Sequence, residues 1–374
     1  MEINLEKMVS PLQLKNKKLK ILHAPHNVAK QPLYISKIEK EKGYVSDLIV
    51  NYPPAYGLSA DLIISDFQNF NIKSIIKRFY YSLASIFKYD IFNYYFGKTL
   101  FTWDDYFGPR NWLWYWDLKI AKLLGKKVIM TFQGCDLRQS EIGEKYKHSA
   151  CSSLKCPQYA VCQLQYDKQR QWLVKNILPK VDHIFFLNPD LGYYVSHLKS
   201  SFLPYASVPV HDFVVSLPKV SGRIKIVHAP SVPTLKGTPE IFEAIDNLKE
   251  KHDIELILIQ NMPYAEALTH YHQADLVIDQ INIGWYGAFA VEVMAMGKPV
   301  ACYLREEDYK YLPSKFAEDI PIYNLDPNNL IESLELIIAD RSNWQKKGKE
   351  SRNFVEKWHD PKKIQEIVFN KYIE

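Results

Sequence analysis

The most regular pattern along the chain is an alternation of short apolar runs with amphipathic segments. LKILHAP (19–25) is followed by the helix-like ISKIEKEKGY and then by SDLIV, and IKIVHAP (224–230) is followed by PEIFEAIDNLKEKH and then by IELILI. Lys, Ile, His, Ala and Pro recur in register in the two openings. An apolar strand that ends in a small-residue and proline turn is typical of the first strand of a Rossmann-like unit. The alternation of strand and helix predicts a parallel sheet in each half.

Further apolar runs predict the other strands, at 89–95, 126–132, 182–188, 275–280, 299–304 and 321–325. Turn-forming residues interrupt the pattern at 215–222, so we place an N-terminal domain at residues 1–216 and a C-terminal domain at 217–374. We therefore expect an α/β protein of two facing, doubly wound Rossmann-like domains, with ligand bound in the cleft at the carboxyl ends of the strands. The last helix, near 361–373, is expected to cross back onto the first domain.

The bulk composition narrows the classes of function. With 374 residues, 47% of them apolar and 24% charged, the chain has the size and composition of a two-domain globular protein. A net charge of +5 without a clustered basic stripe disfavours nucleic acid as a partner. The N-terminal segment lacks the apolar core of a signal peptide, and no run of about 18 apolar residues occurs, so the expected location is the cytoplasm.

The stretch GWYGAFAVEVMAMGKPV (284–300) carries candidate chemistry. Because it follows a predicted strand, we expect a helix from near Gly287 to Gly297. Its first turn offers four backbone N–H groups to a phosphate, those of Gly287, Ala288, Phe289 and Ala290. Gly284 and Gly287 would let a ligand approach the backbone closely. Glu292 lies about one turn further, where a carboxylate can accept two hydrogen bonds from a ribose diol. The alternative is that Glu292 caps a core helix or pairs with a buried lysine.

A second candidate anion site precedes the helix predicted after residue 237. Thr238 is the expected N-cap and Pro239 the first helical residue, which places Lys236 in the loop between strand and helix. Lys236 would then point toward the same crevice as the first site. The alternative is a solvated surface charge.

These motifs carry a family resemblance. K-G-T before a helix, A-D-x-x-I-D-Q, G-W-Y-G and A-x-E-x-M-A-x-G-K-P-V resemble the C-terminal domain of glycosyltransferases with the GT-B fold, most closely those of the retaining family 4. HAPHN and FQGCD (132–136) resemble the N-terminal domain of that family. The resemblance implies a nucleoside-diphosphate-sugar donor in the C-terminal domain, an acceptor in the N-terminal domain, and no cofactor or metal for transfer. It implies that Glu292 binds the ribose and that Lys236, alone or with His228, neutralises the donor diphosphate.

The chain departs from the family pattern at three positions. The first glutamate of the Glu-x7-Glu motif falls at Gly284, the arginine that normally precedes the lysine falls at Pro230, and a histidine near the reacting centre is replaced by Gln133. Other polar side chains of the same loops complete the candidate site. They are Asp136 and Asn27 on the catalytic side and Arg138 and Trp103 on the acceptor side. The alternative for Asn27 is a simple turn residue.

The function that these residues imply is sugar transfer to an acceptor hydroxyl in the synthesis of a surface glycan. The acceptor would be a glycan or a lipid-linked glycan, and the resemblance implies a retaining reaction without an assigned enzymic nucleophile. Two alternatives remain: a GT-B nucleotide-sugar epimerase, and a non-catalytic partner that binds a nucleotide-sugar.

Three features of the first half lie outside this site. Residues 71–90 combine helical apolar spacing with Lys73, Lys77, Arg78 and Lys88, which favours an ordinary helix packed on the sheet over contact with an anionic membrane surface. The tryptophan-rich segment 102–127 favours apolar packing over sugar stacking or lipid contact.

Four of the five cysteines form the third feature, because they are close in sequence: Cys135, Cys151, Cys156 and Cys162. Their spacing is looser than that of common zinc knuckles, which favours reduced thiols or a disulfide over a structural zinc. Cys302 stands apart in a predicted strand and is expected to be a core residue.

Overall fold

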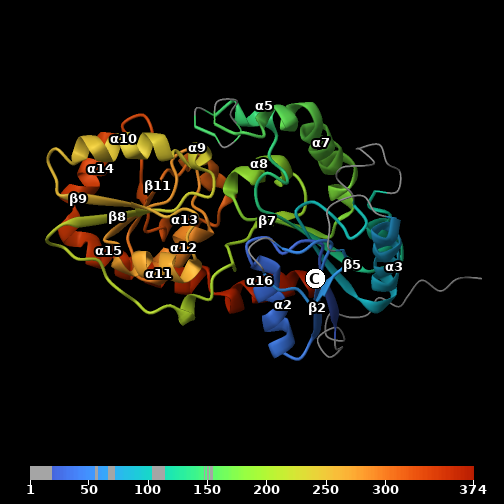
Figure 1. Ribbon diagram of the computed structural model, residues 1–374. Helices are drawn as coiled ribbons and strands as arrows, with labels where there is room; N and C mark the ends of the chain where they lie inside the picture. Colours follow the sequence, from blue (N-terminus) through green and yellow to red (C-terminus); the bar gives the residue numbers. More distant parts are fainter. Residues whose placement is uncertain are drawn as a thin grey trace, which may run out of the picture. The chain divides into compact units, whose positions relative to one another are not determined.

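The computed structural model describes residues 19–54, 58–65, 72–102, 114–146, 148–149, 151 and 155–374. They form two parallel sheets with interleaved helices (Figure 1), which confirms the expected α/β class. The chain packs as two compact units. The first contains the described residues up to Thr131 with Pro179–Ile184 and Lys362–Glu374, and the second contains Phe132–Leu178 and Phe185–Pro361. This division follows packing rather than chain order and leaves the boundary expected at 216/217 as a prediction.

The first sheet has seven strands in the order β3-β2-β1-β4-β5-β6-β7. The strands are β1 (Lys20–Ala24), β2 (Val45–Val50), β3 (Leu62–Ile63), β4 (Ile91–Tyr95), β5 (Lys127–Phe132), β6 (His183–Phe186) and β7 (Ser200–Phe202). β1 runs parallel to both neighbours, with Ile21 beside Ser46 and Ile91. Its residues Ile21, Leu22 and Ala24 are fully buried, as expected of a strand covered on both faces. The order of strands reverses between β1 and β4.

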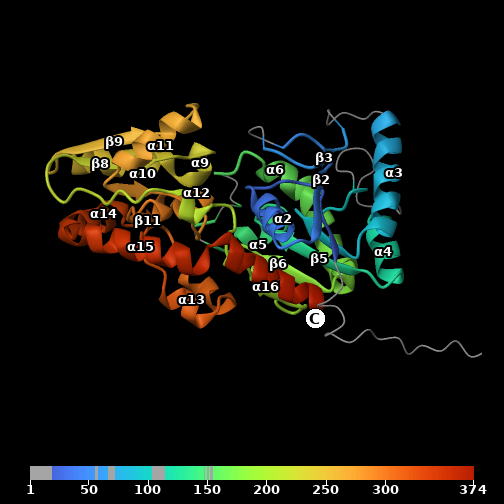
Figure 2. The same cartoon turned by 90° about the horizontal axis from the view of Figure 1, so that it is seen from below.

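Helices cover both faces of this sheet within the first unit. Figures 1 and 2 show α2 (Gln31–Glu41) and α16 (Pro361–Ile373) together on one side, and α3 (Ile72–Lys88) with α4 (Trp116–Leu123) on the other. α16 joins the first unit although it ends the chain, because Tyr372 accepts a hydrogen bond from Asn93 at 3.1 Å and Phe369 packs on Tyr44.

The second sheet has five strands in the order β12-β11-β10-β8-β9. They are β8 (Ile224–His228), β9 (Ile254–Leu258), β10 (Leu276–Ile278), β11 (Val300–Cys302) and β12 (Tyr323–Asn324). β8 is an internal strand, next to the edge strand β9, and is parallel to both neighbours, with Ile226 beside Leu256 and Leu276. These five strands were all expected from apolar runs. In the first sheet, the short strands β3 and β7 were not expected.

The second sheet is also covered on both faces (Figure 1). α10 (Thr238–Leu248) buries Ile241, Ala244, Ile245 and Leu248, the i, i+3, i+4, i+7 spacing of an amphipathic helix, against a core that includes residues of α14 (Leu330–Ala339). The opposite face carries α11 (Tyr264–Gln273), α12 (Ala288–Ala295) and α15 (Trp344–Trp358). Cys302 is buried in β11, as expected.

Shorter elements complete the second unit. The α-helical ones are α5 (Ser140–Gly143), α6 (Tyr159–Val161), α7 (Asp167–Asn176), α8 (Gly192–Val195), α9 (Pro233–Lys236) and α13 (Ser314–Glu318). A π-helical turn (Cys162–Tyr166) joins α6 to α7. Turns of 3-10 helix lie at Pro189–Leu191, Val210–Asp212, Glu306–Tyr311 and Arg341–Asn343, and a further one, Leu178–Lys180, continues into the first unit.

Candidate functional site

The strand order of the second sheet defines where a ligand should bind. β8 lies between β9 and β10, so the connections from β8 and β10 leave on opposite faces of the sheet. In open α/β sheets, ligands bind outside the carboxyl ends of strands at such a switch point. The loops that follow β8 and β10 contain Lys236 and the segment 284–287, so the structure brings both predicted anion sites to one edge.

Asp279 joins the two predicted sites. Lys236 Nζ donates to Asp279 Oδ1 at 3.0 Å, and the backbone N–H of Gly287 donates to Oδ2 at 2.6 Å. The Asp279 side chain is fully buried and that of Lys236 is 12% exposed. The N–H of Gly287 is therefore not open to a phosphate as expected, because a carboxylate of the protein occupies it. Sequence analysis missed Asp279, although an acid that ends an apolar strand was a signal.

The helix that follows begins as expected. α12 starts at Ala288 after the extended Gly287, and Gly297 lies just beyond its end with φ of 76°. Gly287, Ala288 and Phe289 are partly exposed, whereas Ala290 is buried. The Phe289 ring packs on Tyr271 with 5.2 Å between ring centroids. The first turn of α12 thus remains within reach of a ligand at its exposed positions.

Glu292 lies on α12 and accepts a hydrogen bond from the hydroxyl of Tyr264 on α11. It is partly exposed rather than buried, and the partner seen in the structure is a tyrosine rather than the buried lysine considered from the sequence. Tyr264 is itself half exposed. Glu292 thus lies one turn into α12 with its carboxylate partly accessible.

The glycine at position 284 has a structural cause. Its φ is +83°, and a Cβ there would lie 2.9 Å from Cζ of Arg305. Arg305 is buried, donates to Asp308 Oδ2 at 3.0 Å and to the carbonyl of His148, and lies over the Tyr146 ring. Despite Arg305, burial raises the pKa of Asp308 to about 6. A side chain at position 284 would need a left-handed backbone and would displace the buried guanidinium, which gives a physical reason for glycine in place of the glutamate of the family pattern.

Two aromatic residues anchor this loop. Trp285 and Tyr286 are fully buried, and the Tyr286 hydroxyl lies 2.9 Å from Nε2 of His359. Nδ1 of His359 lies 3.0 Å from the carbonyl oxygen of Tyr205, so the ring donates there and accepts from Tyr286. Burial lowers the pKa of His359 to about 4, which keeps the ring neutral. The glycines on either side of Trp285 and Tyr286 are thereby held at the edge of the sheet.

His228 lies beneath the site instead of lining it. It is fully buried, with Nδ1 2.9 Å from the carbonyl oxygen of Ile278 and Nε2 2.8 Å from the hydroxyl of Thr238. Burial lowers the pKa of His228, consistent with a neutral ring that donates to the carbonyl and accepts from Thr238. Thr238 is therefore not the N-cap that the sequence predicted. Gly237, with φ of 83°, holds that position.

Lys155 is a basic residue of the site that sequence analysis missed. Its Nζ donates to Glu240 Oε1 at 2.9 Å and to Asn282 Oδ1 at 2.7 Å, and its side chain is 30% exposed. Asn282 packs against Gly237, next to Lys236. A second lysine thus reaches the loops after β8 and β10 from a segment more than 80 residues away in sequence. Nothing in its local sequence distinguishes it.

The loop after β5 forms a second polar group. The Asp136 carboxylate accepts the backbone N–H groups of Gln133 and Gly134 at 2.8 and 2.6 Å, so it holds the loop closed. Arg138 makes a bidentate ion pair with Asp190, at 2.6 and 3.0 Å. The side chains of Asp136 and Arg138 are buried, and burial raises the pKa of Asp136 despite the two N–H donors.

Tyr205 connects this loop to the switch-point loops. Asn188 donates to the carbonyl of Gln133 and accepts the Tyr205 hydroxyl at 2.7 Å, while the Tyr205 ring packs 6.3 Å from that of Tyr286. Burial raises the pKa of Tyr205, and its electrostatic neighbours include both Arg138 and Asp279. Gln133, Asp136 and Arg138 therefore belong to the same polar neighbourhood as the predicted donor site, within one unit.

The remaining predicted site residues belong to the first unit. Asn27 follows β1, near the point where the first sheet reverses its strand order, and donates to the carbonyl of Ser59 at 3.0 Å. Among the described residues, its buried Oδ1 has no hydrogen-bond partner. Trp103 lies outside the described residues.

The four clustered cysteines do not form a zinc site. All are free thiols, and no three His, Cys, Asp or Glu side chains within the described ranges converge as metal ligands. Cys135 is exposed, whereas Cys151 is buried against Gly143, and burial raises the pKa of Cys151 to about 12. The residues present therefore do not fit the structural zinc considered from the sequence.

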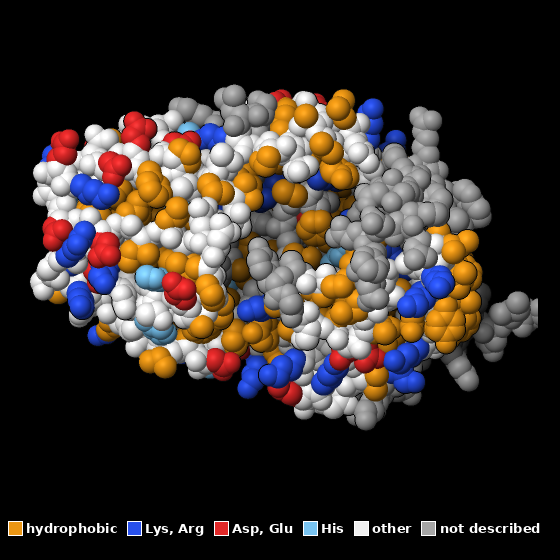
Figure 3. Space-filling view, viewed as in Figure 1, with side chains coloured by type: hydrophobic (Ala, Val, Ile, Leu, Met, Phe, Trp, Pro, Cys, Tyr) orange, Lys and Arg blue, Asp and Glu red, His pale blue; other side chains and the backbone are white. Residues whose placement is uncertain are grey.

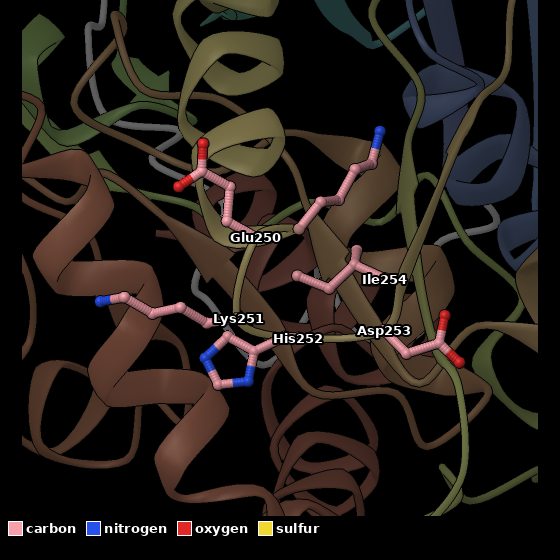
Figure 4. A pocket seen from close by; sticks show the side chains of 6 residues that line it. Glu250, Lys251, His252, Asp253 and Ile254 are labelled. Carbon is pink, nitrogen blue, oxygen red and sulfur yellow. The ribbon is translucent and has the colours of Figure 1, made fainter.

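A depression of about 500 Å³ lies at the other end of the second sheet, where β9 begins (Figure 4). It is lined by Lys249, Glu250, Lys251, His252, Asp253 and Ile254, where α10 ends and β9 begins. Its labelled charged side chains point in different directions. Because α/β sheets bind ligands at the carboxyl ends of their strands, this depression is not a candidate site.

Solved structures share this architecture over nearly the whole chain. Sucrose-phosphate synthase from Thermosynechococcus elongatus matches 95% of the chain and 98% of its own, with 12% identity and a TM-score of 0.62. WaaG, a glycosyltransferase involved in lipopolysaccharide biosynthesis, matches 93% and 99%, with 11% identity and a TM-score of 0.51. The chain has the GT-B fold. At these identities the fold is what is shared.

A third GT-B neighbour is the UDP-GlcNAc 2-epimerase from Neisseria meningitidis, solved with UDP-GlcNAc bound. It matches 95% of this chain and 99% of its own, with 12% identity and a TM-score of 0.50. No family model and no curated protein matches the chain by sequence.

Proposed function

We propose that the protein is a glycosyltransferase that moves a sugar from a nucleoside diphosphate to an acceptor hydroxyl. The observation that carries this proposal is the convergence of Lys236, Asp279 and the start of α12 at the switch point of the second sheet. The GT-B fold supports it, since WaaG is a glycosyltransferase and the epimerase was solved with a nucleotide-sugar bound.

In this proposal the donor diphosphate lies against Lys236 and the first turn of α12. Negative charge develops on the leaving diphosphate as its bond to the sugar breaks, and the lysine with the backbone N–H groups of Ala288 and Phe289 stabilises it. Asp279 orients the ammonium of Lys236 and the start of the helix. Glu292 accepts the ribose hydroxyls, with Tyr264 as its second partner.

In this proposal the loop after β5 lies on the side of the donor site where the sugar is transferred. Each oxygen of Asp136 accepts a backbone N–H of its own loop, so we assign it the positioning of Gln133 rather than proton transfer. Arg138, paired with Asp190, supports the same loop. Asn27, whose Oδ1 has no partner among the described residues, stays a candidate residue of the first unit for contact with the acceptor. We propose a retaining reaction on a glycan or lipid-linked acceptor, needing no cofactor, in surface-glycan synthesis at the inner face of the membrane.

Calorimetric titration with UDP, GDP, ADP and CMP, and then with sugar conjugates of the nucleotide that binds, tests the donor site. Lys236→Gln keeps a hydrogen bond to Asp279 but removes the charge, and Glu292→Gln removes the carboxylate. Each should cost about 1.5–3 kcal/mol of nucleotide affinity, roughly tenfold to a hundredfold. The matched control is Lys249→Gln, an exposed lysine at the opposite edge of the sheet.

Three outcomes would contradict the proposal. Wild-type affinity in both site variants would remove the site assignment. Turnover of the nucleotide-sugar with no acceptor would favour an epimerase, and binding without turnover on any acceptor would favour a non-catalytic partner.

A further inference from the structure

Helix α3 of the first unit has its apolar side turned outward. Large apolar side chains stand exposed along it: Ile72, Ile76, Phe79, Tyr80, Leu83 and Phe87. The side chains that it buries are mostly polar: Arg78, Ser82, Ser85 and Ile86. This is the reverse of an ordinary surface helix, whose apolar stripe faces the core. The sequence pattern favoured packing of this helix on the sheet by its apolar residues. That prediction is wrong for the larger apolar residues, which are exposed.

The exposed residues form one continuous face. They occur at positions i, i+4, i+7, i+8, i+11 and i+15, an arc of about 100° on a helix of 3.6 residues per turn. Ile72, Ile76 and Phe87 are 69%, 63% and 72% exposed, so the ends of the face are as open as its middle. In Figure 3, hydrophobic side chains with neighbouring lysine or arginine cover the region that α3 occupies in Figure 1.

Charge on α3 is of one sign. The helix contains no aspartate or glutamate, and its exposed lysines, Lys73, Lys77 and Lys88, all lie on the same flank of the apolar face. Arg78 points inward and stacks on Tyr52, 4.5 Å from the ring centroid. Leu123 and Leu124, at the end of the neighbouring helix α4, are also exposed.

This combination selects one kind of partner. An apolar face with aromatic residues, bordered by lysines and free of acids, matches a helix that lies in the interface of an anionic bilayer. A second copy of the chain fits less well, because two such faces packed antiparallel about a twofold axis would bring identical lysine rows together. No helix of the described residues is long and apolar enough to cross a membrane, so the contact would be with the bilayer surface.

We propose that α3 docks the protein on the surface of an anionic lipid bilayer. The apolar face enters the headgroup boundary, and Lys73 and Lys77 meet the lipid phosphates. This inference stands on the first unit alone and does not depend on the donor site in the second. With a lipid-linked acceptor, docking would hold the enzyme at the surface where its acceptor lies.

Flotation of the full chain with vesicles tests the proposal. The vesicles consist of phosphatidylcholine alone or with about 30 mol% phosphatidylglycerol, enough to give a negative surface potential. The wild type should float with the anionic vesicles, bind the neutral ones at least tenfold more weakly, and dissociate as salt is raised.

Variants of the face separate this contact from adventitious adhesion. Ile76→Ser with Phe87→Ser should lower the partition coefficient at least tenfold, and Lys73→Gln with Lys77→Gln should lower it roughly tenfold or more. Controls are Leu336→Ser, an equally exposed leucine on α14, and Lys346→Gln with Lys349→Gln, exposed lysines on α15. Because all these side chains are exposed, the variants should keep the wild-type melting temperature.

Three results would overturn the proposal. The first is no flotation with anionic vesicles at low salt. The second is binding that the α3 variants leave unchanged. The third is a dimer in sedimentation velocity that Phe87→Ser dissociates, which would assign the face to a second copy. Nucleotide titration of the same variants tests the membrane contact and the nucleotide site separately. The α3 variants should bind nucleotide with wild-type affinity whether or not they float with vesicles.

Discussion

At the scale of single residues, the site depends on contacts that replace the ones expected from sequence. Arg305 fills the space beside Gly284, and Asp279 fills the first anion position at the start of α12. Both are buried charges with partners, Asp308 for the arginine and Lys236 for the aspartate, as burial of a charge requires. The local sequence identifies the glycines, but their neighbours come from distant segments.

The first prediction concerns Gly284. Gly284→Ala should destabilise the protein more than Gly222→Ala, because both glycines have positive φ but only Gly284 has a neighbour, Arg305, where the Cβ would lie. The backbone strain common to both is about 1–2 kcal/mol. Overlap with the buried guanidinium should add about 1–3 kcal/mol. Urea unfolding of the two variants measures the difference, and equal losses would show that Arg305 moves aside freely.

At the scale of elements, the loop between β10 and α12 is positioned by the end of the chain rather than by its own sequence. Trp285 and Tyr286 enter an aromatic cluster with Phe316 and Phe354, and His359 ties Tyr286 to Tyr205. The neutral His359 therefore supports the glycines on which the donor site depends. Its support should depend on pH.

The second prediction follows from the pKa of His359, about 4 in the folded protein and about 6.5 when unfolded. Because the unfolded state binds the proton more readily, the stability that the neutral ring contributes is complete above about pH 6.5 and is lost as the pH falls toward 4. His359→Gln can keep both hydrogen bonds but does not titrate. The advantage of wild type over this variant should shrink by about 2 kcal/mol between pH 8 and pH 5.

Urea unfolding at the two pH values measures this change. Asp117 and Asp308, whose pKa values burial raises to about 6, are present in both proteins and cancel in the comparison. The control is His197→Gln, the same substitution at an exposed histidine. A pH-independent difference for His359→Gln would contradict the neutral buried ring.

At the scale of the whole molecule, the two compact units divide the proposed tasks. The loops after β8 and β10, the loop after β5 and Lys155 all belong to the second unit, while Asn27 and the exposed face of α3 belong to the first. The proposed nucleotide site and the proposed membrane face therefore lie in different units.

The third prediction uses this division. A nucleoside diphosphate at 100 times its Kd should stabilise the second unit by about 2.7 kcal/mol. Hydrogen exchange measured by mass spectrometry should show protection in β8, β10 and α12, with β1 and β2 unchanged. Protection confined to the first unit would contradict the site assignment.

The sequence by itself determined the class of fold, because continuous apolar runs and 3.6-residue periods are local properties of the chain. The repeated LKILHAP and IKIVHAP openings became β1 and β8, internal strands of the two sheets, and Gly287 and Gly297 bounded a helix as predicted. The sequence also predicted that Lys236 and residues 284–287 lie close together, because loops after adjacent parallel strands meet at one edge of a sheet.

Only the tertiary structure decided what surrounds those residues. Asp279 against Gly287, Lys155 beside Asn282 and Arg305 beside Gly284 are contacts between segments that periodicity does not relate. The same holds for α3, whose amphipathic pattern is visible in the sequence but whose orientation is not. A helix turns its apolar stripe toward whatever buries it, and neighbouring elements of the fold leave that stripe of α3 exposed.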